Sequence, residues 1–561
     1  MDSTTLCPEA LHHKPTFLTR PAFHLFILAL LACVLYFYNV GGWDLWNPDE
    51  PRYALVAKEM AEGGNWILPH LNHQVYPDKP PVFFWLIACA YKVAGTNSLA
   101  ARLPSALAAI AGIMLTYVLG SKIYGSRAGF ISALILSTTV EYFWLGRRAN
   151  IDMTLTLFIV SALYFFYKGY RMNTSKGWSS SIYLFYFFMG AATLTKGPVG
   201  FLLPALTVVV YLFSKKDLRS LKRVLFHPGV FLFLAVVLAW VIPACRQGGE
   251  AYRDNILFKQ TVGRVHDSWS HKQPLYYYFT NLPFLLFPWI FFLPSAFIHL
   301  CTRRKEIKED LLFPFIWFIT TFVFFTICSG KRGLYLLPLF PAGALMIGFL
   351  FNRFFANDPL LNRRLITIPA SLLVGSLLAA CIALPFIGQS LSNQYRQALQ
   401  FYPLLIILGF ASTVALYCLL KKKGATTFSL IIIIMAGCFL SAAGLILPSM
   451  NRFQSAKPFS LKIKSHMKAG DALVSYRLHS EIPAIDFYTG IREIKQFETP
   501  DELITCFTQS NTRIFCLMQK QYFSQLLPIA PVSLTVWDAA LIGRHDIVLI
   551  SNHPPEGQWQ S

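Results

Sequence analysis

Apolar runs long enough to cross a membrane recur along this 561-residue chain from Pro21 to Leu447, and short loops rich in Lys and Arg separate them. A transmembrane helix needs about 20 mostly apolar residues. The pattern therefore predicts a polytopic α-helical membrane protein. The first run, residues 21–40, has no small-residue cleavage site and many runs follow it, so we expect a retained anchor rather than a removed signal peptide.

From about Met450 the apolar runs shrink to strand length. The stretches DALVSYR, REIKQF, TRIFCLMQK and DIVLIS alternate with helix-like stretches such as TPDELITCFTQS, which begins with a capping-type Thr-Pro-Asp-Glu. We therefore expect a transmembrane domain over residues 1–449 and a small α/β domain over residues 450–561. The second domain carries no glycine-rich phosphate-binding motif, which favours a structural or docking role for it.

The Lys and Arg clusters of the loops predict the topology, because such clusters mark the cytoplasmic side. They all share one face if the segment 80–94, which begins with two prolines, is re-entrant or interfacial. We then expect thirteen transmembrane helices, with the amino terminus inside and the carboxyl terminus outside. The expected spans are about 22–41, 104–121, 128–146, 153–170, 181–195, 198–213, 226–245, 282–300, 311–328, 333–351, 365–387, 402–420 and 427–447. The outer loops are then 42–80, 147–152, 246–281 and 329–333.

Composition raises the question of a nucleic-acid partner, because the formal net charge is +21 although 55% of the residues are hydrophobic. The positive charges are scattered through the loops and form no patch with interleaved aromatic residues, so we expect membrane lipids and no nucleic acid as partners. Most cysteines lie in apolar runs without metal-ligand spacing. Cys506 and Cys516 in the polar tail are either a disulfide, if the tail is outside the cytoplasm, or two buried thiols.

The first outer loop contains an acidic pair in WNPDEPRYALVAKEM, residues 46–60. Its apolar spacing predicts a short amphipathic helix at the membrane surface that starts with Asn47 or Asp49 as N-cap and ends at the Gly-Gly pair 63–64. Acidic residues are favoured at a helix amino terminus by the helix dipole. Asp49 and Glu50 therefore fit either capping or catalysis, and one group can serve both.

Several cations stand on the outer face, which positive-inside bias should deplete of Arg. Lys79 precedes an apolar helix in YPDKPPVFFWL, where snorkelling to the interface would explain it, but Arg147 and Arg148 also flank an outer turn beside Asp152. The later outer loops add Arg246, Arg253, Lys259, Arg264, His271, Lys272, Lys331 and Arg332, the last two just ahead of Tyr335.

Converging guanidinium and ammonium groups suit the phosphate of a lipid-linked substrate, because phosphate oxygens accept charge-assisted hydrogen bonds. Anionic lipid headgroups are the alternative ligand for these cations. A general lipid-binding surface, however, gives no role to the carboxylates that stand among them. These are Asp49, Glu50, Asp78 and Asp152. The mixture of acids and cations therefore favours an active site.

Seven motifs carry a resemblance to a known family: WNPDEPRYALVAKEM, YPDKPPVFFWL, AARLPSA, LGRRANIDM, TLTKGPVG, RVHDSWSHKQPLYYYF and SGKRGLYLLPLFPA. The chain resembles GT-C glycosyltransferases of the protein-mannosyltransferase superfamily, and is most similar to bacterial transferases that place 4-amino-4-deoxy-L-arabinose on lipid A. The resemblance implies transfer of a sugar, with inversion, from an undecaprenyl-phosphate carrier to lipid A or another acceptor on the periplasmic face of the inner membrane. Thirteen spans and a periplasmic α/β domain also match that family.

The resemblance also implies roles for single residues. Asp49 would be the principal catalytic acid, with Asp152 as the second aspartate and Glu50 beside it. The donor phosphate would be held by Lys79, Arg264, Arg148 and Tyr335. Further pocket candidates are Asp78, His271, Arg147, Lys331 and Arg332. Pro51 follows the acidic pair where relatives often have glycine, which tightens the start of the helix.

We expect no cofactor; Asp78 with His271 is a weak alternative metal-binding pair, since two ligands without diagnostic spacing are poor support. A protein O-mannosyltransferase-like enzyme, or another transferase with the same donor and a different acceptor, stays an alternative. A solute transporter is an alternative of another class. Transporters typically have ionisable residues near mid-membrane and internal repeats, whereas the ionisable residues here collect at one face.

Overall fold

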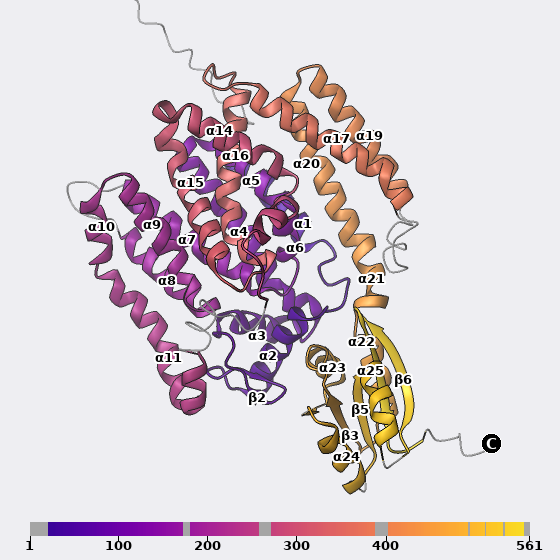
Figure 1. The fold of residues 1–561 in the computed structure, drawn as a ribbon. Helices are drawn as coiled ribbons and strands as arrows, with labels where there is room; N and C mark the ends of the chain where they lie inside the picture. Colours follow the sequence, from indigo (N-terminus) through magenta and orange to yellow (C-terminus); the bar gives the residue numbers. More distant parts are fainter. Residues whose placement is uncertain are drawn as a thin grey trace, which may run out of the picture.

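The computed structural model describes residues 21–171, 180–256, 271–387, 402–491, 494–510, 512–530 and 533–554. Figure 1 shows a bundle of helices from α1 (Pro21–Phe37) to α20 (Gly424–Ser441), with a separate domain that contains the sheet below it. The first outer loop, with α2 (Asp49–Gly63) and α3 (Val82–Ala94), lies at the end of the bundle that faces this domain. The two parts therefore meet at the loop that carries the acidic pair.

Six helical stretches among the described residues are long and apolar enough to cross a membrane. They are Ser98–Tyr124 (α4), Ile151–Arg171 (α7), Leu218–Asp254 (α10 and α11), Gly333–Phe355 (η4 and α16), Arg364–Ala383 (in α17, Arg364–Ile387) and Gly424–Gln454 (α20, η6 and α21). Two sharply bent pairs raise the number to eight: Ser126–Ser137 (α5) with Val140–Gly146 (α6), and Tyr277–Leu285 (α13) with Trp289–Thr302 (η3 and α14). The chain is a multi-pass membrane protein, and the count of thirteen spans stays a prediction.

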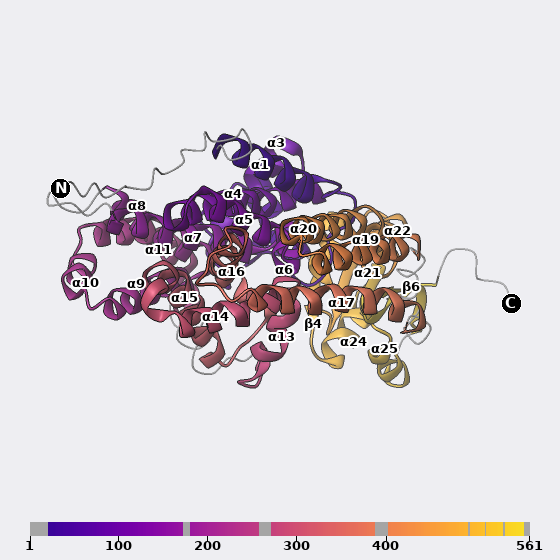
Figure 2. The ribbon, with the colours of Figure 1, turned by 90° about the horizontal axis from the view of Figure 1, so that it is seen from above.

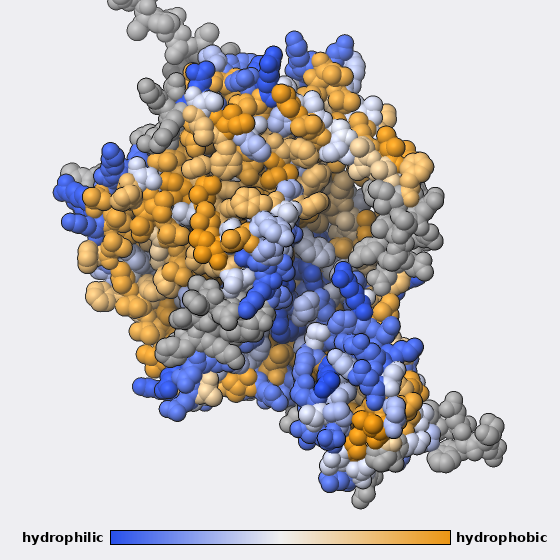
Figure 3. Space-filling model, in the orientation of Figure 1, coloured by the Kyte–Doolittle hydropathy of each residue, from blue (hydrophilic) through white to orange (hydrophobic). Residues whose placement is uncertain are grey.

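Shorter or less apolar helices complete the bundle. They are α1, α8 (Ser181–Lys196), α9 (Val199–Ser214), α15 (Arg304–Ile327) and α19 (Tyr402–Leu420). On the face seen in Figure 3, most of the bundle surface is hydrophobic, and hydrophilic residues gather above it and on the domain below. Phe231 and Phe410 are 74% and 73% exposed. A continuous apolar surface of this kind suits contact with lipid.

The first outer loop folds largely as predicted. The predicted amphipathic helix is α2, which ends at Gly64 in the left-handed conformation with φ 72°. The predicted N-cap is wrong: Pro48 occupies that position, and no side chain caps the helix. The carboxylate of Asp49 is instead turned toward arginine side chains. A short hairpin, β1 (His70–Leu71) and β2 (Gln74–Val75), then leads to α3.

The helix α3 has 13 residues, so it extends only about 20 Å at 1.5 Å per residue. It packs against α2 and α4 through buried aromatic and aliphatic side chains such as Phe83, Phe84 and Ile87. Its length is too short for a full span, which agrees with the prediction of a re-entrant or interfacial segment.

The C-terminal domain contains one mixed sheet with strand order β4-β3-β5-β7-β6. The strands are β3 (Ala472–Tyr476), β4 (Lys495–Phe497), β5 (Ile514–Gln519), β6 (Thr535–Ile542) and β7 (His545–Ser551). β3 pairs in parallel with β4 and β5, whereas β7 pairs antiparallel with β5 and β6. The sequence predicted four of these strands and missed β6, which is a half-exposed edge strand with an irregularity between Val536 and Asp538.

Helices cover both faces of this sheet. One core includes residues of α22 (Lys457–His466) and α23 (Ile482–Thr489), and a second includes residues of α24 (Pro500–Gln509) and α25 (Lys520–Leu526). The predicted cap of α24 is confirmed, because the Thr499 side chain accepts a bond from the Glu502 N–H. Cys506 and Cys516 are free thiols, and Cys516 is buried. The disulfide alternative is therefore not formed in this structure.

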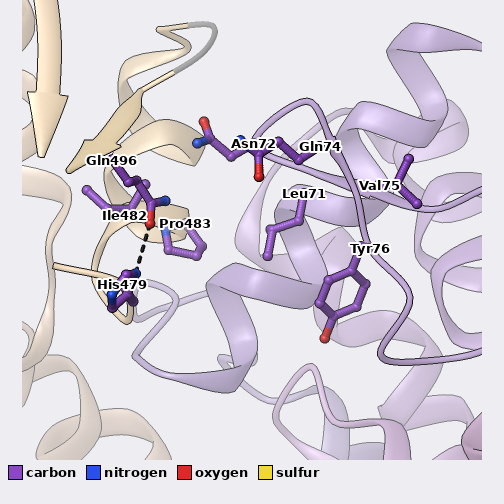
Figure 4. Close-up of a pocket in the computed structure, with 9 residues that line it drawn as sticks. All are labelled: Leu71, Asn72, Gln74, Val75, Tyr76, His479, Ile482, Pro483 and Gln496. Atoms are coloured by element: carbon purple, nitrogen blue, oxygen red, sulfur yellow. Dashed lines mark hydrogen bonds between the residues drawn. The ribbon is translucent and has the colours of Figure 1, made fainter. Parts of the chain in front are cut away.

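A continuous helical path joins the two parts. α20 continues through η6 (Ala442–Ile446) into α21 (Leu447–Gln454), which ends beside the sheet (Figure 1). In the view from above, the C-terminal domain lies beneath α17, α19 and α20 (Figure 2). The β1–β2 hairpin meets α23 across a cavity of about 200 Å³ (Figure 4). Asn72 stabilises the contact between the hairpin and the C-terminal domain. Its side chain donates to the Ile494 carbonyl at 2.9 Å and accepts from the Ile494 N–H at 3.1 Å.

Candidate active site

Asp49 is held between two arginines that come from different parts of the fold. Its Oδ1 lies 2.5 Å from Arg52 Nη2, and its Oδ2 lies 2.7 Å from Arg332 Nη2. Arg332 directly precedes η4 (Gly333–Leu339). Burial alone would raise the pKa of Asp49, but the charges of Arg332, Arg52 and Arg148 outweigh it and keep this pKa below its usual range. Asp49 is therefore a carboxylate at neutral pH.

Asp152 forms a second pair of this kind. It lies in the first turn of α7, is 2% exposed, and forms an ion pair with Lys196, the last residue of α8. The Lys196 ammonium also lies 4.1 Å from the centre of the Tyr335 ring, in η4, which is a cation–π arrangement. A buried carboxylate, a partly buried cation and an aromatic ring thus meet from three elements.

The two aspartates belong to one charged cluster. Asp152 and Lys196 each interact electrostatically with Arg332 and with Asp49. Tyr53 of α2 is within electrostatic range of both aspartates. The structure therefore brings Asp49, Asp152, Arg332 and Tyr335, which the sequence predicted for one site, together from α2, α7 and the start of η4.

Glu50, the neighbour of Asp49, has quite different surroundings. Its two oxygens accept from Arg102 Nε at 2.8 Å and Arg102 Nη2 at 3.0 Å, and from the N–H groups of Ala149 and Trp46 at 2.9 and 3.2 Å. Arg148 approaches the same carboxylate at 3.3 Å. With 1% exposure and both oxygens engaged, Glu50 is placed to hold the loop rather than to meet a substrate.

Arg102 is the centre of this structural cluster. It is fully buried in α4, and in addition to Glu50 it donates to the carbonyl oxygens of Val40, Trp43 and Asp44 at 2.9, 2.8 and 2.7 Å. Its guanidinium stacks on the Trp43 ring at 4.3 Å. All five N–H donors of an arginine are accounted for by these bonds. No role was predicted for Arg102 from the sequence, although it stands in the AARLPSA motif.

The adjacent residues Arg147 and Arg148 also have different surroundings. Arg147 is fully buried and donates to the carbonyl oxygens of Leu35 and Tyr38, both at 2.5 Å, so it anchors the end of α1. Arg148 donates to the Trp46 carbonyl at 3.1 Å and contributes to the field around Asp49. The structure thus places Arg148 beside the charged cluster and Arg147 in a structural contact.

The remaining candidates lie in the loops around the cluster. Lys79 Nζ donates to the Asp78 carbonyl at 3.2 Å, and Asp78 interacts electrostatically with Arg52. Lys331 is 3% exposed; its Nζ donates to the Gln273 carbonyl at 3.0 Å, and its N–H donates to the His271 carbonyl at 2.9 Å. Lys331 therefore ties the turn before η4 to the preceding outer loop. Arg264 lies outside the described residues.

The arrangement also includes residues that sequence reasoning missed. Arg52 follows Asp49 at helical spacing, and that i,i+3 spacing was a usable signal. Lys196 stands in the TLTKGPVG motif, but nothing local in the sequence pairs it with Asp152. Among the residues that the structure describes, no group of three or more His, Cys, Asp or Glu side chains is arranged for a metal ion. The Asp78–His271 pair stays a prediction.

Comparison with known proteins gives this cluster a context. Residues 78–242 match the family described as dolichyl-phosphate-mannose-protein mannosyltransferase. A protein of Aquifex aeolicus without an assigned function is 28% identical over 85% of this chain and 89% of its own length. The undecaprenyl phosphate-alpha-4-amino-4-deoxy-L-arabinose arabinosyl transferase of Edwardsiella ictaluri is 28% identical over 58% of this chain. The match covers 59% of that transferase's length.

Solved structures show the same fold. The structure of ArnT from Cupriavidus metallidurans bound to undecaprenyl phosphate superposes with a TM-score of 0.79 at 20% identity, over 96% of this chain and 99% of that one. The oligosaccharyltransferase AglB of Archaeoglobus fulgidus, in complex with an inhibitory peptide and a dolichol-phosphate, gives a TM-score of 0.52 at 12% identity, over 92% of this chain and 69% of that one. The family model and the arabinosyl transferase agree with the resemblance that the sequence motifs indicated, and the solved structures share the fold.

Proposed function

We infer that this chain, a GT-C glycosyltransferase of the protein-mannosyltransferase family, transfers a sugar from a polyprenyl-phosphate carrier at the outer end of its helical bundle. The observation that carries the proposal is the cluster of Asp49, Asp152, Lys196 and Arg332, where buried carboxylates and cations from α2, α7, α8 and the start of η4 meet. A lipid-linked donor needs both kinds of group: cations for the phosphate and carboxylates for the sugar or the acceptor.

As the specific reaction we propose transfer of 4-amino-4-deoxy-L-arabinose from undecaprenyl phosphate to lipid A, with inversion. The similarity to the Edwardsiella arabinosyl transferase supports the sugar and the carrier. We propose that the protein spans the bacterial inner membrane thirteen times, with the cytoplasmic amino terminus and the periplasmic C-terminal domain that the loop charges indicate. The site would then face the periplasm.

In the proposed mechanism an acceptor oxygen attacks the anomeric carbon, and the polyprenyl phosphate leaves with the bond electrons. Negative charge develops on that phosphate, and Lys79, Arg148 and Arg264 would stabilise it, with Tyr335 beside them. Preorganised donors of this kind contribute about 3–4 kcal/mol each in other enzymes. Arg332 forms an ion pair with Asp49 and interacts electrostatically with Asp152 and Lys196, so an incoming phosphate would compete with Asp49 for its guanidinium.

The role of Asp49 follows from its charge. A general base works best with a pKa near the operating pH, whereas the arginines hold the pKa of Asp49 below its usual range. A phosphate acceptor, as on lipid A, is already ionised and needs no strong base. We therefore propose that Asp49 orients the acceptor or recognises the cationic amino sugar, with Asp152 as the second carboxylate of the pocket.

The family match keeps one alternative open, because its description names a protein as the acceptor. Mass spectrometry of lipid A and of periplasmic proteins, from cells with and without the gene, separates the two reactions. A mass increase on lipid A equal to an aminopentose, lost on deletion and restored by the wild-type gene, supports the proposal. A hexose on protein selects the alternative acceptor, and no change in either pool overturns both.

A further inference from the structure

The segment that delivers Asp49 to the site is held from two sides. On the membrane side, Arg102 donates to the carbonyl oxygens of Trp43 and Asp44 at 2.8 and 2.7 Å, and Arg148 donates to that of Trp46 at 3.1 Å. These bonds occupy three carbonyl oxygens of residues 43–46. The N–H groups of the segment need acceptors from other parts of the chain, because a buried N–H group without a hydrogen bond is costly.

The Asp44 and Leu45 N–H groups and the Trp46 indole N–H are bonded to the C-terminal end of the chain, whereas the Trp46 backbone N–H donates to Glu50. Asn451 Oδ1 accepts from the Asp44 N–H at 3.0 Å and from the Trp46 indole N–H at 2.9 Å. The Tyr488 hydroxyl accepts from the Leu45 N–H at 2.8 Å. Residues 44–46 are thereby bonded to α21 and α23 on one side and to arginines of the bundle on the other.

The Asp44 side chain adds a third link on the same side. Ser455 Oγ donates to its Oδ2 at 2.8 Å, and Lys457 Nζ approaches its Oδ1 at 3.5 Å. Trp46 and Ser455 also form an isolated antiparallel bridge. The contact therefore consists of directional polar bonds. Such bonds fix which residues of the segment face α21 and α23, and not only that the segment lies near them.

We propose that Asn451 and Tyr488 are positioning residues for Asp49. Their bonds reach residues 44–46, three to five positions before Asp49, and the first turn of α2 follows directly from that segment. Asp49 must meet Arg332, which belongs to another element, so a shift of the segment moves the carboxylate away from the site. The inference rests on the proposed function for its kinetic consequence.

This assignment gives the C-terminal domain a part in catalysis without a second active site. α21 continues from the membrane helix α20 through η6, and α23 packs on α2. The domain therefore contacts this region at two places. Asn451 and Tyr488 bond to the segment before the first turn of α2, and α23 packs against the side of α2. A displacement of about 1 Å in a catalytic group costs up to about 100-fold in rate, so small changes at this contact are measurable.

The test compares Asn451→Leu with Asn451→Asp, because both keep the branched shape of asparagine and only aspartate keeps the acceptor oxygen. Tyr488→Phe removes the other acceptor, and Tyr522→Phe, on α25, is the matched control. With a polyprenyl-phosphate sugar donor we expect kcat to fall about 10- to 100-fold in Asn451→Leu and Tyr488→Phe. The donor KM should stay within about two-fold, as expected when only the transition state loses an interaction. Asn451→Asp should recover most of the rate.

Hydrogen exchange of the same purified proteins measures the positioning without turnover. Backbone amides of residues 44–48 should exchange faster in Asn451→Leu and Tyr488→Phe, while the control keeps the wild-type pattern. Wild-type exchange and wild-type kcat in both variants would overturn the inference, and so would a higher KM at unchanged kcat or a failure of Asn451→Asp to recover. A wild-type protein that uses no polyprenyl-phosphate sugar overturns the proposed function, and the exchange data then decide the positioning alone.

Discussion

Replacing Arg102 by lysine tests the buried cluster that supports the acidic pair. Arg102 is fully buried and donates five hydrogen bonds, two to Glu50 and three to carbonyl oxygens of residues 40–44. A lysine keeps the charge but has three donors on one nitrogen. At least two of the five acceptor contacts are then lost, and each buried polar group left without a partner costs about 1–3 kcal/mol.

The expected loss for Arg102→Lys is therefore about 2–6 kcal/mol of unfolding free energy, similar to the 3–5 kcal/mol typical of a broken buried ion pair. Titration of the detergent-purified protein with SDS, followed by circular dichroism, measures it. Arg219→Lys is the matched control, because Arg219 is exposed at the start of α10, and its replacement should change the unfolding free energy by less than about 0.5 kcal/mol.

The double variant Arg102→Met with Glu50→Gln separates charge from packing. Removing Arg102 alone leaves the Glu50 carboxylate 1% exposed and without its bidentate partner. Neutralising both groups should therefore recover part of the loss seen in Arg102→Met, because the uncompensated buried charge is gone. An unfolding free energy for Arg102→Lys equal to that of wild type and of the control would refute the structural role of the cluster.

Three further predictions concern the site and the domain contact. Asp49→Asn should abolish transfer in a donor-to-acceptor assay while the purified protein stays folded by circular dichroism, with the exposed Asp501→Asn as control; near-normal transfer would remove Asp49 from the mechanism. Lys79→Ala should raise the donor KM at least about ten-fold, as expected if an ion pair worth about 1.5–3 kcal/mol is lost, and an unchanged KM would exclude contact with the carrier phosphate. Burial, with Glu59 nearby, raises the pKa of Asp486 to about 7. The folded protein then holds a proton that the unfolded chain releases above about pH 4, so the unfolding free energy should fall as pH rises from 4 to 7, and a profile that rises over this range would contradict the pKa.

Much of the fold could be predicted because the signals are local. The outer helix α2 shows its apolar spacing and its Gly-Gly stop within residues 46–64, and four strands of the C-terminal sheet are compact apolar runs. β6 was missed because an edge strand that is partly exposed on both faces lacks a clear alternation. The bend between α13 and η3 (113°) falls at Pro288, whereas the bend between α5 and α6 (69°) falls at no proline or glycine and depends on tertiary packing.

The candidate site, too, could be predicted from the sequence only in part. Asp49, Asp152 and Arg332 could be predicted as one group because each is a charge at the outer end of an apolar run. The division of labour between Asp49 and Glu50 could not, since adjacent residues on a helix point about 100° apart and their partners come from distant elements. Arg102 stands in a helical apolar run, and its partners lie 52 to 62 positions earlier in the chain. Only the folded arrangement shows that pairing.

The bidentate bond between Glu50 and Arg102 has a consequence for comparing related chains. Positions 50 and 102 share one buried bond pair, 52 residues apart, so a substitution at one is tolerated only if the other changes with it. The Asp49 position carries no such link to residue 102. In an alignment of relatives the two positions of the acidic pair should therefore vary independently. Position 49 should change with the chemistry of the substrate, and position 50 should change together with position 102 of α4, to which the loop is bonded.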